Sequence, residues 1–356
     1  MIKKKLNKIR RGIDCIDSSI VKLLNRRGRL SSEIGVIKKI RNYPVYSPDR
    51  ESVIYNSVAS KGKGPLSTDS LKAIYREIMS ACLSLEQPIV VAYFGPELTY
   101  THQASMRKFG SSVTYLPCDN IPEVFREVEK GNADYGVVPV ENSIEGAVNH
   151  TADMFVDSPL LICSEAYLRV RHSLLSKAQD IKSVKRIYSH PQVFGQCRMW
   201  IEKNAPWAKL VETSSTSRAA EIVSKMRDSA CIASSLAAER YQLQVLKRSI
   251  EDSANNVTRF LIIGKQMAGV TGHDKTSILF SVKDKPGVLH DTLAAFKAAH
   301  INMSKIESRP SRVQAWKYYF FVDIEGHCED KKVKRALEQL ADKCNFVKVL
   351  GSYPKV

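Results

Sequence analysis

Basic side chains in the first fifty residues are spaced as if to bind a small anion. Apolar residues recur every seven positions from Ile9 to Ile37, a second apolar row runs beside them, and Arg27 interrupts that second row. A charged group in an apolar seam costs free energy unless an anion pairs with it. Lys38 lies about three helical turns further on and returns to nearly the same face. Arg27 and Lys38 therefore predict an anion site, unless Arg27 extends past the stripe to solvent.

Three more charged residues can join Arg27 and Lys38. Arg10 precedes them in the same helical run, and Arg50 lies in the first turn of the next one. Glu86 stands near the end of a third helical run. Taken singly, Arg10 and Arg50 are typical of a solvated helix face. Together the five residues favour a cation-lined site for a small anion over separate solvated helix faces.

This pattern resembles the all-helical chorismate mutase family. The match rests on Arg10, Arg27, Lys38 after Gly35, and Arg50-Glu51 after Pro44-Val45. The resemblance implies that the segment rearranges chorismate without covalent help from the protein, with Lys38 and Glu86 beside the ether oxygen. It implies Arg27, Lys38 and Glu86 as catalytic residues. The chorismate-binding residues that it implies are Arg10, Arg27, Lys38, Arg50, Glu51, Cys82 and Glu86.

The chain departs from this family's pattern at three positions. Glu86 stands where many members have glutamine, Ser47 where some have aspartate, and Cys82 where a hydroxyl is common. An ionised carboxylate only accepts hydrogen bonds, whereas glutamine also donates them. The protonation state of Glu86 therefore enters the expected mechanism.

Polar residues follow several predicted strands in the middle of the chain. Runs at 89–94, 135–140, 186–189 and 231–233 are typical of buried strands, and each is followed by a polar loop and a helical stretch. Repeated units of this kind predict an α/β domain whose ligands bind at the carboxyl ends of the strands. Thr99, Asn142 and Ser143 lie in such loops, and helix capping is the alternative role for residues of these types.

Four motifs in this region resemble prephenate dehydratase over nearly its full length. They are residues 95–103 (GPELTYTHQ), 138–146 (VPVENSIEG), 189–192 (SHPQ) with Gln196-Cys197, and 256–261 (NVTRFL). The triplet Thr258-Arg259-Phe260 is the most distinctive, whereas Leu98 stands where glycine is common. The resemblance implies decarboxylation and dehydration of prephenate with no cofactor, because formation of an aromatic ring drives the step.

The roles of individual residues follow from the same resemblance. Thr258 could donate a proton to the departing ring hydroxyl, which adds a fourth catalytic residue. Arg259 could hold the pyruvyl carboxylate. His102, His190 and Glu145 are expected to be structural or capping residues. The prephenate-binding residues that the resemblance implies are Thr99, Thr101, Asn142, Ser143, Gln196, Ser215, Thr258, Arg259 and Phe260.

A third pattern begins near Thr276. Predicted strands at 277–282, 302–307, 316–324 and 346–350 and helices at 288–299 and 331–342 give the order βαββαβ, a ferredoxin-like unit. Residues 286–289 (PGVL) and 307–310 (ESRP) resemble the motifs of an amino-acid-binding ACT regulatory domain, although Val288 replaces the usual alanine. The resemblance implies an allosteric phenylalanine site between two protomers, built from Gly287, Val288, Leu289, Glu307, Ser308, Arg309 and Pro310.

The sequence thus predicts a multidomain chain. The expected parts are an all-α chorismate mutase domain at 1–87, a two-lobed, periplasmic-binding-protein-like α/β dehydratase domain at 88–268, and an α+β ferredoxin-like ACT domain at 272–356. The predicted helices of the first domain are 6–40, 48–60 and 67–86. A helix of about 35 residues is some 50 Å long, too long for two short partners to cover. A homodimer is therefore expected, and a tetramer is left open.

Composition excludes several other classes of protein. Hydrophobic residues make up 44% of the chain and charged residues 26%, as in ordinary globular proteins. No run of eighteen apolar residues predicts a membrane span, and Lys3-Lys4-Lys5 is not followed by the apolar core of a signal peptide. The eight cysteines have no metal-binding or C-x-x-C spacing, which predicts reduced thiols, no metal and a cytoplasmic protein.

Two other functions fit parts of the sequence. A net charge of +17 fits nucleic-acid binding, but no recognition motif accompanies it. A non-catalytic ligand sensor could be built from the same three modules, although it need not keep both sets of reactive side chains. The main prediction is a bifunctional enzyme of phenylalanine biosynthesis. It converts chorismate to prephenate and prephenate to phenylpyruvate, and phenylalanine inhibits it.

Overall fold

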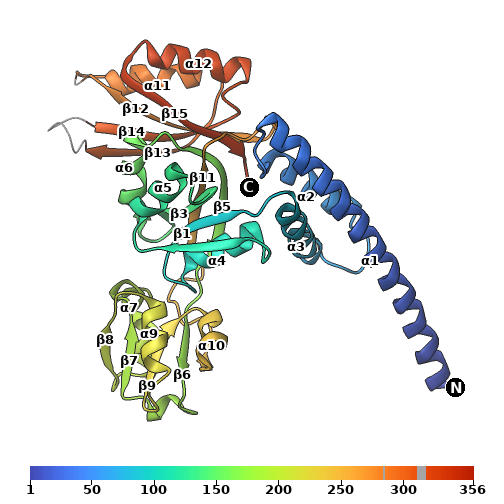
Figure 1. The fold of residues 1–356 in the computed structure, drawn as a ribbon. Helices are drawn as coiled ribbons and strands as arrows, with labels where there is room; N and C mark the ends of the chain where they lie inside the picture. Colours follow the sequence, from blue (N-terminus) through green and yellow to red (C-terminus); the bar gives the residue numbers. More distant parts are fainter. Residues whose placement is uncertain (284, 311–317) are drawn as a thin grey trace. The chain divides into compact units, whose positions relative to one another are not determined.

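The first part of the chain is all helical, as predicted. It consists of α1 (Ile2–Arg41), α2 (Pro48–Lys61) and α3 (Thr68–Glu86) (Figure 1). Helix α1 ends at Asn42, which takes the left-handed conformation with φ 53°. Helix α2 begins with a proline in its first turn, and the Ser67 side chain caps α3 by accepting a hydrogen bond from the backbone N–H of Ser70.

The computed structural model describes residues 1–283, 285–310 and 318–356. Their contacts group them into two units. The first unit contains Met1–Val90 together with Lys108–Thr114, and the second contains Val91–Arg107 together with Tyr115–Val356. None of the described helices is both long enough and apolar enough to cross a membrane.

Small residues let α1 and α3 approach each other closely. Gly28, Ser31 and Gly35 are the buried residues of α1. A Cβ atom added to Gly35 would lie 2.7 Å from Cα of Glu86, so only glycine fits there. The rest of α1 stays open, and the side chains of Ile9, Ile16, Leu23, Leu30 and Ile37 are each more than half exposed. The heptad stripe therefore needs a partner that the described part of this chain does not supply.

The middle part of the chain forms two lobes, each with its own sheet (Figure 1). The first sheet has the order β2-β1-β3-β11-β5, with β4 beside β3. Its strands are β1 (Val90–Phe94), β2 (Thr114–Cys118), β3 (Tyr135–Asn142), β4 (Gly146–Ala147), β5 (Leu161–Arg169) and β11 (Val257–Gly264). Its helices are α4 (Tyr100–Phe109), α5 (Ile121–Lys130) and α6 (Asn149–Asp157).

The second lobe is inserted between β5 and β11. Its sheet has the order β10-β6-β9-β7-β8. The strands are β6 (Ser173–Ser176), β7 (Arg186–Ser189), β8 (Lys209–Glu212), β9 (Ser229–Ala233) and β10 (Gln244–Lys247). A short 3-10 helix spans Ile181–Ser183, and the α-helices are α7 (Pro191–Gln196), α8 (Arg198–Asn204), α9 (Thr216–Val223) and α10 (Ser235–Tyr241). Because the chain passes between the lobes twice, at 170–172 and 248–256, the two crossing segments lie beside each other.

The C-terminal part has the predicted βαββαβ order. It consists of β12 (Asp274–Val282), α11 (Val288–Ala298), β13 (Met303–Pro310), β14 (Tyr318–Glu325), α12 (Lys331–Ala341) and β15 (Cys344–Pro354). The strands are antiparallel in the order β13-β14-β12-β15, and Trp316, the expected start of the third strand, lies outside the described residues. One sheet face packs on both helices through Ile278, Phe280 and Val322. The other face packs on the first lobe, where Gly351 comes so close to Ile162 that no side chain would fit.

Candidate active sites

Lys38 and Glu86 form the best-defined part of the helical unit's candidate site. The Lys38 ammonium group donates to Glu86 Oε2 at 2.8 Å and to the carbonyl oxygen of Val45 at 2.6 Å. Their side chains are only 19% and 10% exposed. The close packing at Gly35 brings α3 to α1 at this level, so the pair follows from the glycine as well as from the two charges.

Arg27 is partly buried on the same helix. Its Nη1 atom is shielded from solvent and has no hydrogen-bond partner among the described residues. A buried guanidinium nitrogen without an acceptor is costly. Arg27 therefore has a donor free for an anionic ligand. The alternative, that its guanidinium group extends to solvent, does not hold for the Nη1 atom, which is buried.

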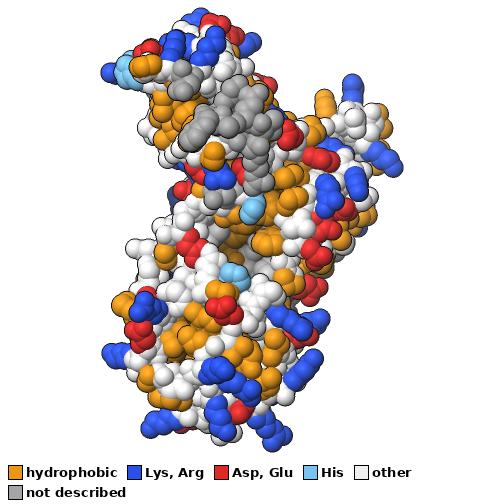
Figure 2. Space-filling view, turned by 90° about the vertical axis from the view of Figure 1, so that its left-hand side faces the viewer, with side chains coloured by type: hydrophobic (Ala, Val, Ile, Leu, Met, Phe, Trp, Pro, Cys, Tyr) orange, Lys and Arg blue, Asp and Glu red, His pale blue; other side chains and the backbone are white. Residues whose placement is uncertain are grey.

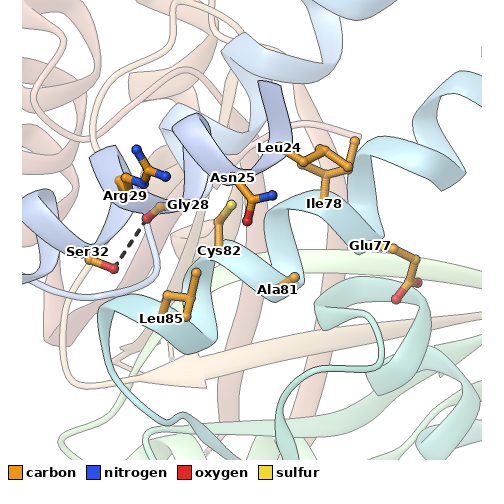
Figure 3. Close-up of a pocket in the computed structure, with 10 residues that line it drawn as sticks. All are labelled: Leu24, Asn25, Gly28, Arg29, Ser32, Glu77, Ile78, Ala81, Cys82 and Leu85. Carbon is orange, nitrogen blue, oxygen red and sulfur yellow. Dashed lines mark hydrogen bonds between the residues drawn. The ribbon is translucent and has the colours of Figure 1, made fainter. Parts of the chain in front are cut away.

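The other predicted chorismate ligands do not all meet in one chain. Arg10 is exposed, and its distance from Arg27 along one helix is about 25 Å. Arg50 is also exposed and lines a separate cavity of about 330 Å³ with α2 and α3 residues. Cys82 is buried and lines a pocket of about 560 Å³ between α1 and α3, beside Gly28 (Figure 3). One chain thus unites Lys38 with Glu86, but it leaves Arg10 apart.

Glu51 has a partner that sequence reasoning missed. Its Oε2 atom lies 2.7 Å from the Lys108 ammonium group and accepts a hydrogen bond of 2.7 Å from the Tyr46 hydroxyl. The Lys108 ammonium also lies 5.8 Å from the centre of the Tyr46 ring, and that ring packs on Phe109 at 5.0 Å. Lys108 and Phe109 therefore complete the surroundings of Glu51, although they come much later in the sequence.

The second candidate site is a cavity of about 950 Å³ between the two lobes. The face shown in Figure 2 is hollowed at this level. Most of the predicted prephenate-binding residues line the cavity, and the ones that do so are Thr99, Thr101, Asn142, Gln196, Ser215, Thr258 and Phe260. Ser143 does not line it, because its hydroxyl turns away to donate to the carbonyl oxygen of Asn255. The Thr99 hydroxyl is likewise hydrogen-bonded to backbone carbonyl oxygens, those of Phe94 and Pro96.

Side-chain amides orient the Thr258 hydroxyl. Thr258 and Asn142 are paired across strands β11 and β3, and Asn142 Nδ2 donates to Thr258 Oγ1 at 2.8 Å. The same amide donates to Asn256 Oδ1, and Asn256 donates to Gln196 Oε1 at 2.9 Å. Because Thr258 Oγ1 accepts this hydrogen bond, its own proton is left to point into the cavity.

Gln196 links this amide chain to both lobes. Its Oε1 atom lies 2.7 Å from His172 Nε2, and its Nε2 atom donates to Glu145. The Tyr100 hydroxyl lies 3.0 Å from His172 Nδ1. Burial lowers the pKa of His172, so the ring is neutral. The Tyr100 hydroxyl donates to the carbonyl oxygen of Arg171 at 2.8 Å, and the contact of His172 Nε2 with Gln196 Oε1 holds the Gln196 amide in place.

The two histidines expected to be structural do hold backbone groups. His102 Nδ1 accepts from the N–H of Leu98, and His190 Nδ1 accepts from the N–H of Gln192. Burial also lowers the pKa of His102. Glu145 was expected to cap a helix, but it instead accepts the hydrogen bond from Gln196 across the cavity.

Arg259 does not fit its predicted role as a carboxylate ligand. Successive residues of a strand point to opposite faces, so Thr258 and Phe260 face the cavity while Arg259 faces the C-terminal sheet. There it donates to Glu165 Oε2 at 2.8 Å and to Asp323 Oδ2 at 2.5 Å. Burial opposes its charge, but Tyr353, Asp323 and Glu165 together raise the pKa of Arg259 above its ordinary value.

The predicted regulatory residues fall into two groups. Gly287 precedes α11 with φ +76°, a left-handed conformation that favours glycine, and Val288 and Leu289 begin that helix. The motif 307–310 forms the end of the edge strand β13. Within it, Arg309 Nη2 lies 3.4 Å from Asp153 Oδ1, while its buried Nε atom has no partner among the described residues. No hydrogen bond or ion pair between described residues joins the two groups.

No described cluster of three or more histidine, cysteine or acidic side chains is placed to hold a metal ion. Both candidate sites consist of charged side chains, amides and hydroxyls.

Three family models match successive parts of the chain. Residues 9–87 match the model "Chorismate mutase type II", residues 91–268 match "Prephenate dehydratase", and residues 276–342 match "ACT domain". The matches follow one another in the order in which the sequence motifs occur.

Relatives match this chain over nearly its whole length. A bifunctional chorismate mutase/prephenate dehydratase of Aquifex aeolicus is 49% identical over 99% of this chain and 98% of the relative. The one from Escherichia coli K12 is 30% identical over 97% of this chain and 95% of the relative. Among solved structures, a prephenate dehydratase from Arthrobacter aurescens in complex with L-Phe has a TM-score of 0.70 and 33% identity, covering 75% of this chain and 90% of that one.

Proposed function

The chain belongs to the bifunctional chorismate mutase/prephenate dehydratase family, and we propose which of its residues perform each reaction. Its two reactions convert chorismate to prephenate and prephenate to phenylpyruvate, in the biosynthesis of phenylalanine. The observation that carries the residue assignment is that one chain holds both constellations. The helical unit holds the Lys38–Glu86 pair and Arg27, whose buried Nη1 atom has no partner among the described residues, and an oriented Thr258 hydroxyl faces a large cavity.

The mutase reaction needs a compact dianion and positive charge at the ether oxygen. Arg27 binds one substrate carboxylate, because its buried Nη1 atom has no other acceptor. Lys38 faces the ether oxygen, where negative charge grows as the C–O bond breaks. Glu86 lies beside Lys38 and donates to the same oxygen in its protonated form. Glu51, held by Lys108 and Tyr46, contributes its other carboxylate oxygen to the substrate.

A second copy of the chain completes the mutase site. The exposed heptad stripe of α1 is long and apolar, and such a stripe is stabilised by packing against other helices. The pocket between α1 and α3 offers a further apolar surface, lined by Leu24, Ile78 and Leu85 (Figure 3). Arg10 is too far along α1 to meet Arg27 of its own chain, but in a dimer it can reach the site of the partner. We therefore assign the chain as a homodimer.

The dehydratase reaction takes place in the cavity between the lobes. Thr258 donates its proton to the ring hydroxyl as that group leaves as water, the bond to the ring carboxylate breaks at the same time, and solvent returns a proton to Thr258. The electrons of the broken C–C bond enter the ring, which becomes aromatic, and carbon dioxide departs. Asn142 keeps the Thr258 proton directed at the substrate by occupying the acceptor side of its oxygen. Gln196, Thr101 and Ser215 are polar lining groups that orient prephenate.

The last part of the chain is a regulatory domain that binds phenylalanine. The open N-terminus of α11 after Gly287 supplies backbone N–H groups for an amino-acid carboxylate, with Val288 and Leu289 beside it. Residues 307–310 supply the second part of the site, from the neighbouring protomer. We assign residues 1–87, 88–268 and 272–356 to mutase, dehydratase and regulator. All eight cysteines are free thiols, in keeping with work in the cytoplasm.

One coupled assay tests this proposal. Purified protein is given chorismate, and prephenate and phenylpyruvate are followed with and without phenylalanine. We expect phenylpyruvate to form without added cofactor and its formation to slow with phenylalanine. A protein that binds phenylalanine but converts neither substrate would instead be a sensor, and the catalytic assignment would be wrong.

A further inference from the structure

Four charged side chains are buried together between the first lobe and the C-terminal sheet. Arg259 of β11 and Glu165 of β5 come from the lobe, and Asp323 of β14 and Lys275 of β12 come from the sheet. Their side chains are at most 7% exposed. The Lys275 ammonium group donates to both Glu165 oxygens at 2.9 Å, and Arg259 bridges Glu165 and Asp323.

Hydroxyl groups complete the hydrogen bonds of this cluster. Arg259 Nη2 donates to the Tyr353 hydroxyl at 2.9 Å, and Ser277 lies 2.5 Å from Asp323 Oδ1 and 2.6 Å from Tyr353. Two cations and two anions balance in charge. Removing one member of such a buried set leaves its partner uncompensated, so the set acts as a unit.

The cluster lies directly behind the proposed acid of the dehydratase site. Arg259 follows Thr258 in the chain, and the backbone of β11 pairs with β3 at Asn142, which orients the Thr258 hydroxyl. The guanidinium plane of Arg259 is held at three points, two of which, Asp323 and Tyr353, belong to the C-terminal sheet. A planar guanidinium group bound in this way fixes the position and orientation of β11 relative to the C-terminal sheet, at the residue next to Thr258.

We propose that Arg259 is a positioning residue of the dehydratase reaction, which anchors the Thr258 strand to Asp323 and Tyr353 of the C-terminal sheet. The C-terminal sheet then holds the strand that carries Thr258 in place. The dehydratase reaction therefore depends on the packing of the regulatory domain against the first lobe. This inference rests on the proposed dehydratase function. It differs from a role in binding a substrate carboxylate, because Asp323 lies on the far side of β11 from the cavity and would not matter to such a ligand.

The test compares Asp323→Asn, Arg259→Gln, Arg259→Lys and the double variant Arg259→Gln/Asp323→Asn in the full-length protein. With prephenate supplied, we expect Asp323→Asn to lower kcat on the order of 10-fold or more, because small misplacements of catalytic groups are costly, and to leave KM within about threefold. Arg259→Lys should recover part of the kcat that Arg259→Gln loses. The double variant should be no worse than Arg259→Gln, because Glu165 keeps Lys275 as its partner.

A second interface cation provides the matched control. Lys348 of β15 donates to the carbonyl oxygens of Phe155 and Ser158, away from β11, so Lys348→Gln should keep the wild-type kcat. Mutase activity and circular dichroism of each preparation report whether the protein is folded. If Arg259→Gln does not fold, Asp323→Asn and Tyr353→Phe decide by the same criterion, since neither changes β11.

Two results would overturn the inference. One is wild-type kcat in Asp323→Asn and Tyr353→Phe. The other is an increase in KM alone in Arg259→Gln, which is the behaviour of a substrate ligand. A wild-type protein that does not turn over prephenate would contradict the proposed function itself, and would be recognised before any variant is compared.

Discussion

The Lys38 ammonium group lies 2.8 Å from Glu86 Oε2, so a cation and an acid from two helices meet at the point where the ether oxygen of chorismate is expected. Lys38 alone can stabilise the negative charge that grows on that oxygen. Glu86 helps only when it carries a proton, because an ionised carboxylate repels the oxygen. The pair therefore predicts a mutase whose activity depends on the ionisation of one carboxyl group.

Replacement of Glu86 by glutamine tests this dependence. We expect Glu86→Gln to keep its mutase activity at about pH 8, because an amide donates at any pH, and to give a pH profile of kcat/KM that differs from that of the wild type. The measurement is kcat/KM from roughly pH 4.5 to 9, with circular dichroism to detect unfolding in acid. Profiles of the two proteins that superimpose would show that Glu86 is not the donor.

Replacement of Thr258 tests the proposed acid of the dehydratase. Thr258→Ala should lower dehydratase kcat by about 10²–10⁴-fold, so that prephenate accumulates from chorismate. Thr258→Ser keeps the hydroxyl that Asn142 orients, and it is the matched control that should retain most activity. A loss of only a few-fold in Thr258→Ala would return this residue to a purely structural role.

Arg27→Ala should stop the mutase without weakening the fold. The variant loses a carboxylate contact, which corresponds to about 10²–10³-fold in rate. It also removes a guanidinium atom that is buried without a partner, so the free energy of unfolding should stay the same or increase. The neighbouring Arg26 is exposed, and Arg26→Ala is the control that should keep mutase activity. Near-normal conversion of chorismate by Arg27→Ala would contradict the anion site.

Two glycines with the same backbone geometry allow a test of the phenylalanine site. Gly287 and Gly272 have φ of +76° and +81°, and alanine would be strained by roughly 1–2 kcal/mol at either. Gly287→Ala should weaken phenylalanine binding by about tenfold, because relief of that strain moves the N–H groups that begin α11. Gly272→Ala should bind as the wild type does. Calorimetry on the full-length protein measures both, and equal affinities in the two variants would exclude the α11 site.

Helices and strands were predictable from the sequence where the apolar periodicity and the glycine and proline residues indicated the same bounds. The heptad stripe and the glycine- and proline-rich breaks located α1, α2 and α3, and the βαββαβ order of the last part was readable from alternation and from Gly287. Thr258 could be found because it stands in a distinctive triplet.

Arg259 could not be assigned from the same triplet. Its partners Glu165 and Asp323 lie 94 and 64 positions away, and neighbouring strand residues face opposite ways. A motif shows only that certain residues follow one another in the sequence. The face of β11 that lines the cavity is set by the pairing of β11 with β3 and β5 and by the packing of the C-terminal sheet. The structure therefore gives Arg259 partners that the triplet did not indicate.

Lys108 was missed for a related reason. It lies within the stretch that matches prephenate dehydratase, and yet the structure groups it with the helical unit. Nothing in the local sequence of α4 indicates a contact with Glu51, 57 positions earlier. The packing of Phe109 on Tyr46, with the hydrogen bonds of Ser111 to Glu77 and of Ser112 to Ser80, brings this lysine to its carboxylate.

Lys108 should therefore matter to the mutase, although it belongs to the dehydratase sequence. Glu51 and Lys108 are 11% and 15% exposed, and loss of the lysine leaves the Tyr46 hydroxyl as the sole remaining donor to a nearly buried carboxylate among the described residues. We expect Lys108→Gln to lower mutase kcat/KM by roughly tenfold, the equivalent of about 1.4 kcal/mol, because Glu51 is no longer held for the substrate.

The exposed neighbour Arg107 provides the control, and Arg107→Gln should leave mutase kcat/KM unchanged. In the Glu51→Gln background the further change Lys108→Gln should have no effect, since the two residues act through one contact. Additive losses in that double variant would mean that Lys108 acts on the mutase by another route.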